Sequence, residues 1–174
     1  FQADMNKPFG LGGASSCGMF ARIMLWRAGL EDPRFTVPYA DRISYAISDI
    51  LNIGRENGGF IPYSVNGPQP KPGDILYLDG SPNGGFEHVG IFVKDNGDGT
   101  WTTIDGGQPG IEERIRTMQS NGIFANDGRE LTAFVSLETL PLPCPIGALA
   151  VAALALGIGV AAGVSVAAYG MEKV

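Results

Sequence analysis

The sequence predicts an α+β fold with an antiparallel sheet, followed by one transmembrane helix. Amphipathic stretches with helical spacing come first, and a series of short apolar stretches bounded by turn residues follows them. No charged residue occurs between Glu138 and Glu172. The chain is therefore expected to comprise a soluble domain over residues 1–138, a proline-rich linker over 139–145 and a transmembrane helix over 146–170.

Two helices are expected in the first third of the chain. An apolar stripe at helical spacing predicts a helix over residues 17–29, with a serine as its N-cap and Gly29 at its end. A second stripe predicts a helix over 41–53, which the Asn-Gly-Gly at 57–59 terminates. Consecutive strands separated by turn signals are then expected at 74–78, 88–93, 100–105, 111–116 and 131–137.

Composition excludes some classes of partner and suggests others. The formal net charge of −6 argues against nucleic-acid binding, which needs a basic surface. The apolar segment that begins at Ile146 would span about 36 Å as a helix, against about 30 Å for the hydrocarbon core of a bilayer. It contains a Gly159-x-x-x-Gly163 spacing, which is typical of helix packing in membranes. The membrane is therefore an expected partner of this segment.

One histidine and two cysteines are the main candidates for chemistry. Cys17 lies at the start of a predicted helix, where the dipole and the amide groups favour a thiolate and can hold an oxyanion. His88 begins a predicted strand and can serve as its general base. Asp105, at the end of the next strand, can orient the imidazole. One histidine and two distant cysteines do not make a zinc site, so no metal or cofactor is expected.

Each of these residues also has an ordinary structural interpretation. A buried cysteine, a strand histidine and an aspartate before Gly-Gly are common in cores and turns. Asp74, in a Pro-Gly-Asp sequence, is expected to cap a turn and start a strand. Trp101 and Tyr77 are candidates to line a substrate groove, although packing in the core or at a sheet edge is the more common role.

Four motifs in order resemble the NlpC/P60 and CHAP peptidoglycan hydrolases. Ser16-Cys17-Gly18 is similar to the nucleophile motif of these families, and Lys71-Pro72-Gly73-Asp74 to their Pro-Gly-Asp strand opening. Glu87-His88-Val89-Gly90-Ile91 resembles their histidine strand, and Thr103-Ile104-Asp105-Gly106 the strand that carries the third polar residue. The resemblance covers residues 10–137. It implies a papain-like fold, with the cysteine helix packed on an antiparallel sheet, and hydrolysis of amide bonds in peptidoglycan.

The sequence departs from the family pattern at two positions. Ser16 precedes the cysteine where these families usually have aspartate. The third residue is commonly His, Asn, Gln or Glu, whereas Asp105 is the candidate here and Gln108 is a neighbouring one. Ser16, Gly18 and Gln108 are therefore expected to support the oxyanion or the imidazole.

The resemblance leaves several biological settings open. A membrane-anchored cysteine amidase or endopeptidase would face the cell wall or periplasm, as an envelope enzyme, a delivered antibacterial effector or a phage lytic protein. An effector would have an immunity-type inhibitor or a secretion partner, and a phage protein would have virion partners. The alternatives are a non-catalytic binding or structural module of the same fold, and a cysteine acyltransferase or protease with another substrate.

Overall fold

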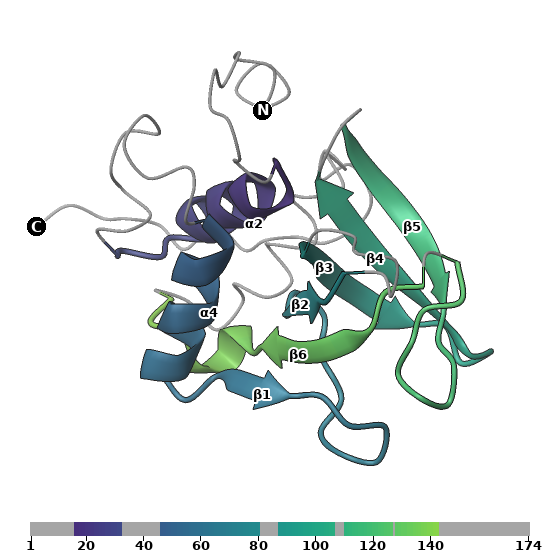
Figure 1. Cartoon of the computed structure of the whole chain (residues 1–174). Coiled ribbons are helices and arrows are strands. Elements are labelled where there is room, and N and C mark those ends of the chain that lie inside the picture. The colour runs from purple at the N-terminus through teal and green to yellow at the C-terminus, as the bar shows by residue number, and fades with distance from the viewer. Residues whose placement is uncertain (1–15, 33–45, 81–86, 107–109, 127, 143–174) are drawn as a thin grey trace, which may run out of the picture.

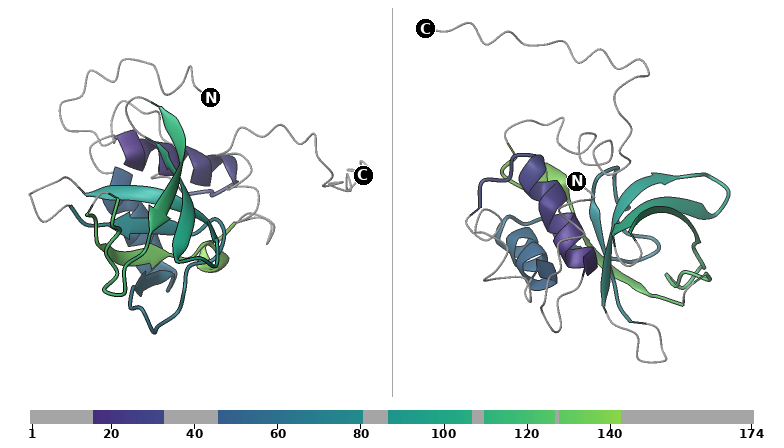
Figure 2. Two further views of the ribbon diagram at one scale, coloured as in Figure 1. Left: turned by 90° about the vertical axis from the view of Figure 1, so that its right-hand side faces the viewer. Right: turned by 90° about the horizontal axis from the view of Figure 1, so that it is seen from above.

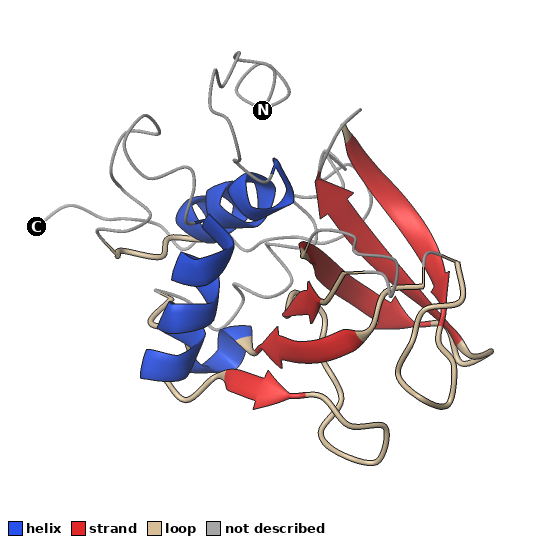
Figure 3. Cartoon of the chain, in the orientation of Figure 1, coloured by secondary structure: helices blue, strands red, loops and turns tan. Residues whose placement is uncertain are grey.

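The computed structural model describes residues 16–32, 46–80, 87–106, 110–126 and 128–142. Within these ranges, two helices cover one face of a six-stranded sheet, and a short 3-10 turn follows the last strand (Figures 1 and 3). The elements are α2 (Ser16–Arg27), α4 (Ala46–Glu56), β1 (Phe60–Pro62), β2 (Ile75–Leu78), β3 (His88–Asp95), β4 (Thr100–Gly106), β5 (Ile111–Thr117), β6 (Leu131–Val135) and η3 (Leu137–Thr139).

The sheet is antiparallel throughout, as predicted. Its strand order is β1-β6-β2-β3-β4-β5, so β2 to β5 form a meander and β6 returns to pair between β1 and β2. The expected strands are all present, but the prediction missed β1 at Phe60–Pro62. It also extended the last strand to Leu137, whereas β6 ends at Val135 and the chain turns into η3. A three-residue strand that ends in proline carries too little periodicity to be recognised from sequence.

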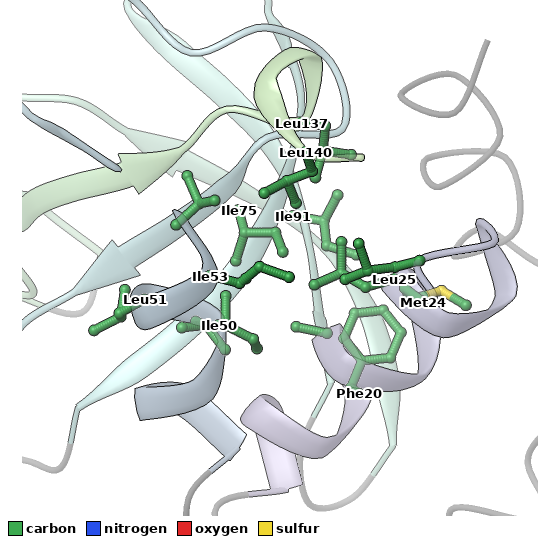
Figure 4. Close-up of a cluster of buried hydrophobic side chains, with 14 of the residues drawn as sticks. Phe20, Met24, Leu25, Ile50, Leu51, Ile53, Ile75, Ile91, Leu137 and Leu140 are labelled. Atoms are coloured by element: carbon green, nitrogen blue, oxygen red, sulfur yellow. The ribbon is translucent and has the colours of Figure 1, made fainter. Parts of the chain in front are cut away.

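The two faces of the sheet bury separate apolar clusters because strand side chains alternate. The first cluster lies between the sheet and the two helices, which Figure 2 shows stacked on the curved sheet. Its members include Phe20, Met24, Leu25, Ile50, Ile53, Ile75, Ile91 and Leu137 (Figure 4). The second cluster lies on the opposite face and comprises Leu76, Leu78, Phe92, Trp101, Phe124, Leu131 and Phe134.

Both helices end at a glycine in the left-handed region. Gly29 has φ 89°, and the amides of Gly29 and Leu30 donate to the carbonyls of Trp26 and Leu25, which is the Schellman pattern. Gly58 ends α4 in the same way, with φ 71°. The predicted helix over 17–29 is therefore confirmed, with its last helical residue at Arg27. The helix expected over 41–53 is described from Ala46 and continues to Glu56.

Asp74 has the structural role that its Pro-Gly-Asp sequence predicts. Gly73 has φ 97° and the amide of Asp74 donates to the carbonyl of Lys71, which closes a tight turn. The buried Asp74 carboxylate accepts hydrogen bonds from the Lys71 amide at 2.8 Å and the Leu137 amide at 3.0 Å. It thereby connects the start of β2 to the chain that leaves β6.

The predicted transmembrane helix over 146–170 and its proline-rich linker from 143 onward lie outside the described residues. Within the ranges that are described, neither helix is long and apolar enough to cross a membrane. The membrane anchor therefore stays a prediction from the sequence.

Candidate active site

His88 and Asp105 form a hydrogen-bonded pair on neighbouring strands. His88 is the first residue of β3, and its Nε2 lies 2.7 Å from Oδ2 of Asp105 on β4. The His88 side chain is 17% exposed and that of Asp105 is 4% exposed. The sheet register places Asp105 opposite Gly90, two residues along β3 from His88, so both side chains lie on the same face of the sheet.

Cys17 completes the arrangement from the helix layer. It is the second residue of α2, its thiol is buried, and α2 packs against both β3 and β4. A hydrogen bond links the Cys17 and His88 side chains. Since Nε2 of the imidazole is engaged by Asp105, Nδ1 is the ring nitrogen left for the thiol. The structure thus brings Cys17, His88 and Asp105 together from three separate elements.

The electrostatics of the site favour a protonated imidazole. Burial opposes the charged form of His88, but hydrogen bonds to Asp105 and Cys17 and the negative charges of those groups outweigh it. The pKa of His88 is therefore raised from 6.5 to about 9. Burial likewise opposes ionisation of Asp105, yet the His88 hydrogen bond and the nearby Arg116 charge lower its pKa to about 2.

Two further residues hold the Asp105 carboxylate, and the sequence analysis missed both of them. Thr103 Oγ1 donates to Asp105 Oδ1 at 2.9 Å, and the Arg116 guanidinium donates to Oδ2 through Nη2. Arg116 is 2% exposed and lies on β5 opposite Trp101. In the sequence it appears as one of several charges in the segment 111–117, a pattern typical of an exposed strand. Only the register of β4 with β5 shows that it is buried beside Asp105.

Gly90 leaves the room that the carboxylate occupies. A Cβ placed on Gly90 would lie 2.8 Å from Asp105 Oδ1. The residue stands directly across the ladder from Asp105, where a pair of side chains on one face would compete for the same space. Glycine is therefore needed at this position of the His-Val-Gly sequence because it leaves room for the Asp105 carboxylate. The backbone conformation does not require it, since the φ of Gly90 is not positive.

A second glycine sets the distance between the helix and the sheet. A Cβ on Gly106, the last residue of β4, would lie 2.1 Å from Cβ of Phe20. Phe20 is fully buried one helical turn after Cys17. The close approach of α2 to the end of β4 thus depends on Gly106. This close approach brings Cys17, at the start of α2, near the strand that contains Asp105.

The other predicted site residues are the groove candidates Trp101 and Tyr77 and the supporting residues Ser16, Gly18 and Gln108. Trp101, a candidate for the substrate groove, instead has the core-packing role that was its alternative: it is 5% exposed and packs edge-on against Phe92 and Phe124 in the second cluster. Tyr77 on β2 is half-buried and hydrogen-bonded to Glu87, the residue before His88, which leaves it at the border of the site. Gly18 is buried in the first turn of α2. The side chain of Ser16 and the whole of Gln108 lie outside the described residues.

Comparison with known protein families identifies the domain. A family model for the CHAP domain matches residues 8–107, more than half of the chain. The chain belongs to the CHAP domain family. CHAP domains are typically cysteine- and histidine-dependent amidohydrolases, so membership supports hydrolase chemistry. No curated protein and no solved structure matches the chain.

The CHAP match spans the motifs that carry Cys17, His88 and Asp105 and ends just after β4. Arg116 on β5 lies beyond the matched residues. Among the side chains that the structure describes, no group of three or more His, Cys, Asp and Glu residues is arranged to hold a metal ion.

Proposed function

We propose that this CHAP domain hydrolyses amide bonds of bacterial peptidoglycan, with Cys17 as nucleophile, His88 as general base and acid, and Asp105 as the residue that orients the imidazole. The observation that carries the proposal is the position of His88. Its imidazole is hydrogen-bonded to a helix-start thiol on one side and to a buried carboxylate on the other. A nucleophile, a base and an orienting acid in this order are what acyl transfer needs.

Acylation begins with the transfer of the Cys17 proton to His88. The Cys17 sulfur then attacks the carbonyl carbon of the substrate amide, and the amide groups at the start of α2 stabilise the developing oxyanion. The carbon–nitrogen bond breaks as the His88 imidazolium donates its proton to the departing nitrogen. The amine product leaves, and the acyl group remains on Cys17 as a thioester.

Deacylation uses the same residues in the opposite sense. Neutral His88 accepts a proton from a water molecule, and the resulting hydroxide attacks the thioester carbon. The carbon–sulfur bond breaks, the carboxylic acid product leaves, and the thiol is regenerated with the proton held by His88. Asp105 stays ionised in both steps, because its pKa of about 2 lies far below neutral pH.

The test is digestion of purified peptidoglycan by the full chain, with the soluble products identified by mass spectrometry. We expect the wild-type protein to release fragments with a new amine and a new carboxylate, and Cys17→Ala to release none. The masses distinguish cleavage within the stem peptide from cleavage between peptide and glycan. The matched control is Cys144→Ala, which removes the other cysteine in the sequence and is expected to retain full activity.

Three outcomes would overturn the proposal. Undiminished hydrolysis by Cys17→Ala would exclude Cys17 as the nucleophile. Absence of product from the wild-type protein, together with slow alkylation of Cys17 by iodoacetamide, would favour a non-catalytic module. Cleavage of a protein or lipid amide or ester, with no action on peptidoglycan, would assign the same residues to another substrate.

A further inference from the structure

We propose that Arg116 and Thr103 form a positioning pair that fixes the Asp105 carboxylate against His88, extending the site by two buried residues on β4 and β5. Thr103 is fully buried and Arg116 is 2% exposed. The inference rests on the proposed function, because it concerns how the orienting acid of that mechanism is held.

The hydrogen bonds around Thr103 have only one consistent direction. An arginine guanidinium can only donate, and an ionised carboxylate can only accept. Arg116 Nε therefore donates to Thr103 Oγ1 at 3.1 Å, and the single Thr103 hydroxyl proton is donated to Asp105 Oδ1 at 2.9 Å. Arg116 Nη2 donates to Oδ2, the same oxygen that faces His88 Nε2. Both carboxylate oxygens are thus occupied, which defines the plane of the carboxylate.

The guanidinium is itself held by the second apolar cluster. Its central carbon lies 5.2 Å from the ring centroid of Phe124, which is fully buried. The Phe124 ring packs edge-on against Trp101, the residue opposite Arg116 in the ladder. A buried aromatic support of this kind limits the rotamers that the arginine can adopt. The pair is therefore rigid without contacting a reacting atom.

Arg116 also balances the charge of the buried site. A Cys17 thiolate, a His88 imidazolium and the Asp105 carboxylate together carry one excess negative charge, which the guanidinium cancels. An uncompensated charge in a buried site is strongly unfavourable. Arg114 cannot fill this role as well, because its Nε is 3.8 Å from Asp105 Oδ2, its side chain is 46% exposed and it also pairs with Glu112.

The test compares Thr103→Val, which has nearly the same shape, with Thr103→Ser, which keeps the hydroxyl. Both are made in the full chain carrying Cys144→Ala, so that Cys17 is the remaining thiol. Among the described residues, Cys17 on α2 and Asp105 on β4 are hydrogen-bonded to His88. Arg114 and Arg116 on β5 face the Asp105 carboxylate, and Tyr77 on β2 is hydrogen-bonded to Glu87, the residue before His88. Both variants leave every one of these groups in place.

We expect Thr103→Val to lower kcat on peptidoglycan roughly tenfold or more with little change in KM, because a misdirected carboxylate misaligns the imidazole. The alkaline limb of the pH–rate profile for hydrolysis should move to lower pH, since a weaker Asp105 contact holds the His88 proton less firmly. Thr103→Ser should restore both. If Thr103 had only a structural role, Thr103→Val would change the midpoint of thermal unfolding and leave the alkaline limb of the pH–rate profile at the same pH.

Arg116→Lys provides an independent variant if Thr103→Val does not fold. Lysine keeps the positive charge but lacks the forked guanidinium that donates to Asp105 and Thr103 at once. We therefore expect kcat to fall again and the alkaline limb of the pH–rate profile to move to lower pH. Wild-type kcat and an unchanged pH profile in the folded variants would overturn the positioning pair. Undiminished hydrolysis by the Cys17→Ala variant would instead overturn the proposed function on which the pair rests.

Discussion

Asp105 Oδ2 lies 2.7 Å from His88 Nε2 and also accepts a hydrogen bond from the Arg116 guanidinium. One carboxylate oxygen therefore serves two cationic partners. The His88 hydrogen bond and the positive charge of the Arg116 guanidinium both lower the pKa of Asp105, so the carboxylate is held in its ionised form. The acid can therefore orient the imidazole without competing for its proton.

Replacement of His88 should cost more than replacement of Asp105. His88→Ala removes the group that moves the proton in both steps, and we expect a loss in kcat of roughly 10²–10⁴-fold. Asp105→Ala leaves the imidazole in place, so its loss should be smaller, at roughly ten- to a hundredfold. Initial rates of peptidoglycan solubilisation, with thermal unfolding to verify that each variant folds, provide the measurement. Equal losses would mean that Asp105 does more than orient the ring.

The alkaline limit of activity should report the pKa of His88. The imidazolium that protonates the departing amine persists up to about pH 9 because Asp105 and Cys17 raise the pKa of His88. Asp105→Asn removes the negative charge, and the limb should then move toward the ordinary histidine value of about 6.5. The pH dependence of kcat/KM for the two proteins tests this. A limb that stays near pH 9 in Asp105→Asn would assign it to another group.

Stability should depend on pH through the same pair. The folded pKa of His88 is raised to about 9, so its contribution is fully present below pH 6.5 and is lost as pH rises through about 9. Its upper bound is about 3 kcal/mol. The folded pKa of Asp105 is lowered to about 2, so its contribution is present above pH 3.8 and is lost as pH falls through about 2. Urea unfolding from pH 2 to 10 measures both.

The matched control for this pH dependence is His88→Gln. The variant should lose much of the decline in the free energy of unfolding between pH 6.5 and 9.5, because the titrating imidazole is gone. An identical decline in the variant and the wild-type protein would place its origin elsewhere in the chain.

Alanine at the two site glycines should have separable effects. Gly90→Ala places a Cβ 2.8 Å from Asp105 Oδ1, so we expect the carboxylate to be displaced and kcat to fall roughly tenfold or more with a modest loss of stability. Gly106→Ala places a Cβ 2.1 Å from Cβ of Phe20, so it should chiefly destabilise the packing of α2, by about 1–3 kcal/mol or more. Thermal unfolding and kcat, measured together, distinguish them. Gly90→Ala with full activity would show that Asp105 tolerates the displacement.

Asp74 should matter for stability rather than for chemistry. Asp74→Ala leaves the Lys71 and Leu137 amides without their acceptor, and we expect a loss of about 2–4 kcal/mol in the free energy of unfolding. The control is Glu138→Gln, which removes an exposed ion pair with Lys71 and should change the free energy of unfolding far less than Asp74→Ala does. Urea titration gives both values. Equal effects of the two substitutions would contradict the role of Asp74 as a buried connection.

Local sequence features determined much of the fold. Helical spacing and the Gly29 signal predicted α2, and the turn signals predicted β2 to β5 as consecutive strands of an antiparallel sheet. These patterns arise from interactions between near neighbours in the chain. β1 was missed, since three residues provide no period to read. The motifs around Cys17, His88 and Asp105 were recognisable because each occupies a short segment at the end of an element.

By itself, the sequence determined the order of helices and strands and the residue types able to act as nucleophile, base and orienting acid. The tertiary structure alone decided that Trp101 is buried and that Arg116 and Thr103 hold Asp105. The physical reason is register: contacts across β4 and β5 depend on which residues stand opposite each other, and a shift of one residue would turn Arg116 to the other face. No local pattern encodes that pairing, so a buried guanidinium and an exposed one look alike in the sequence.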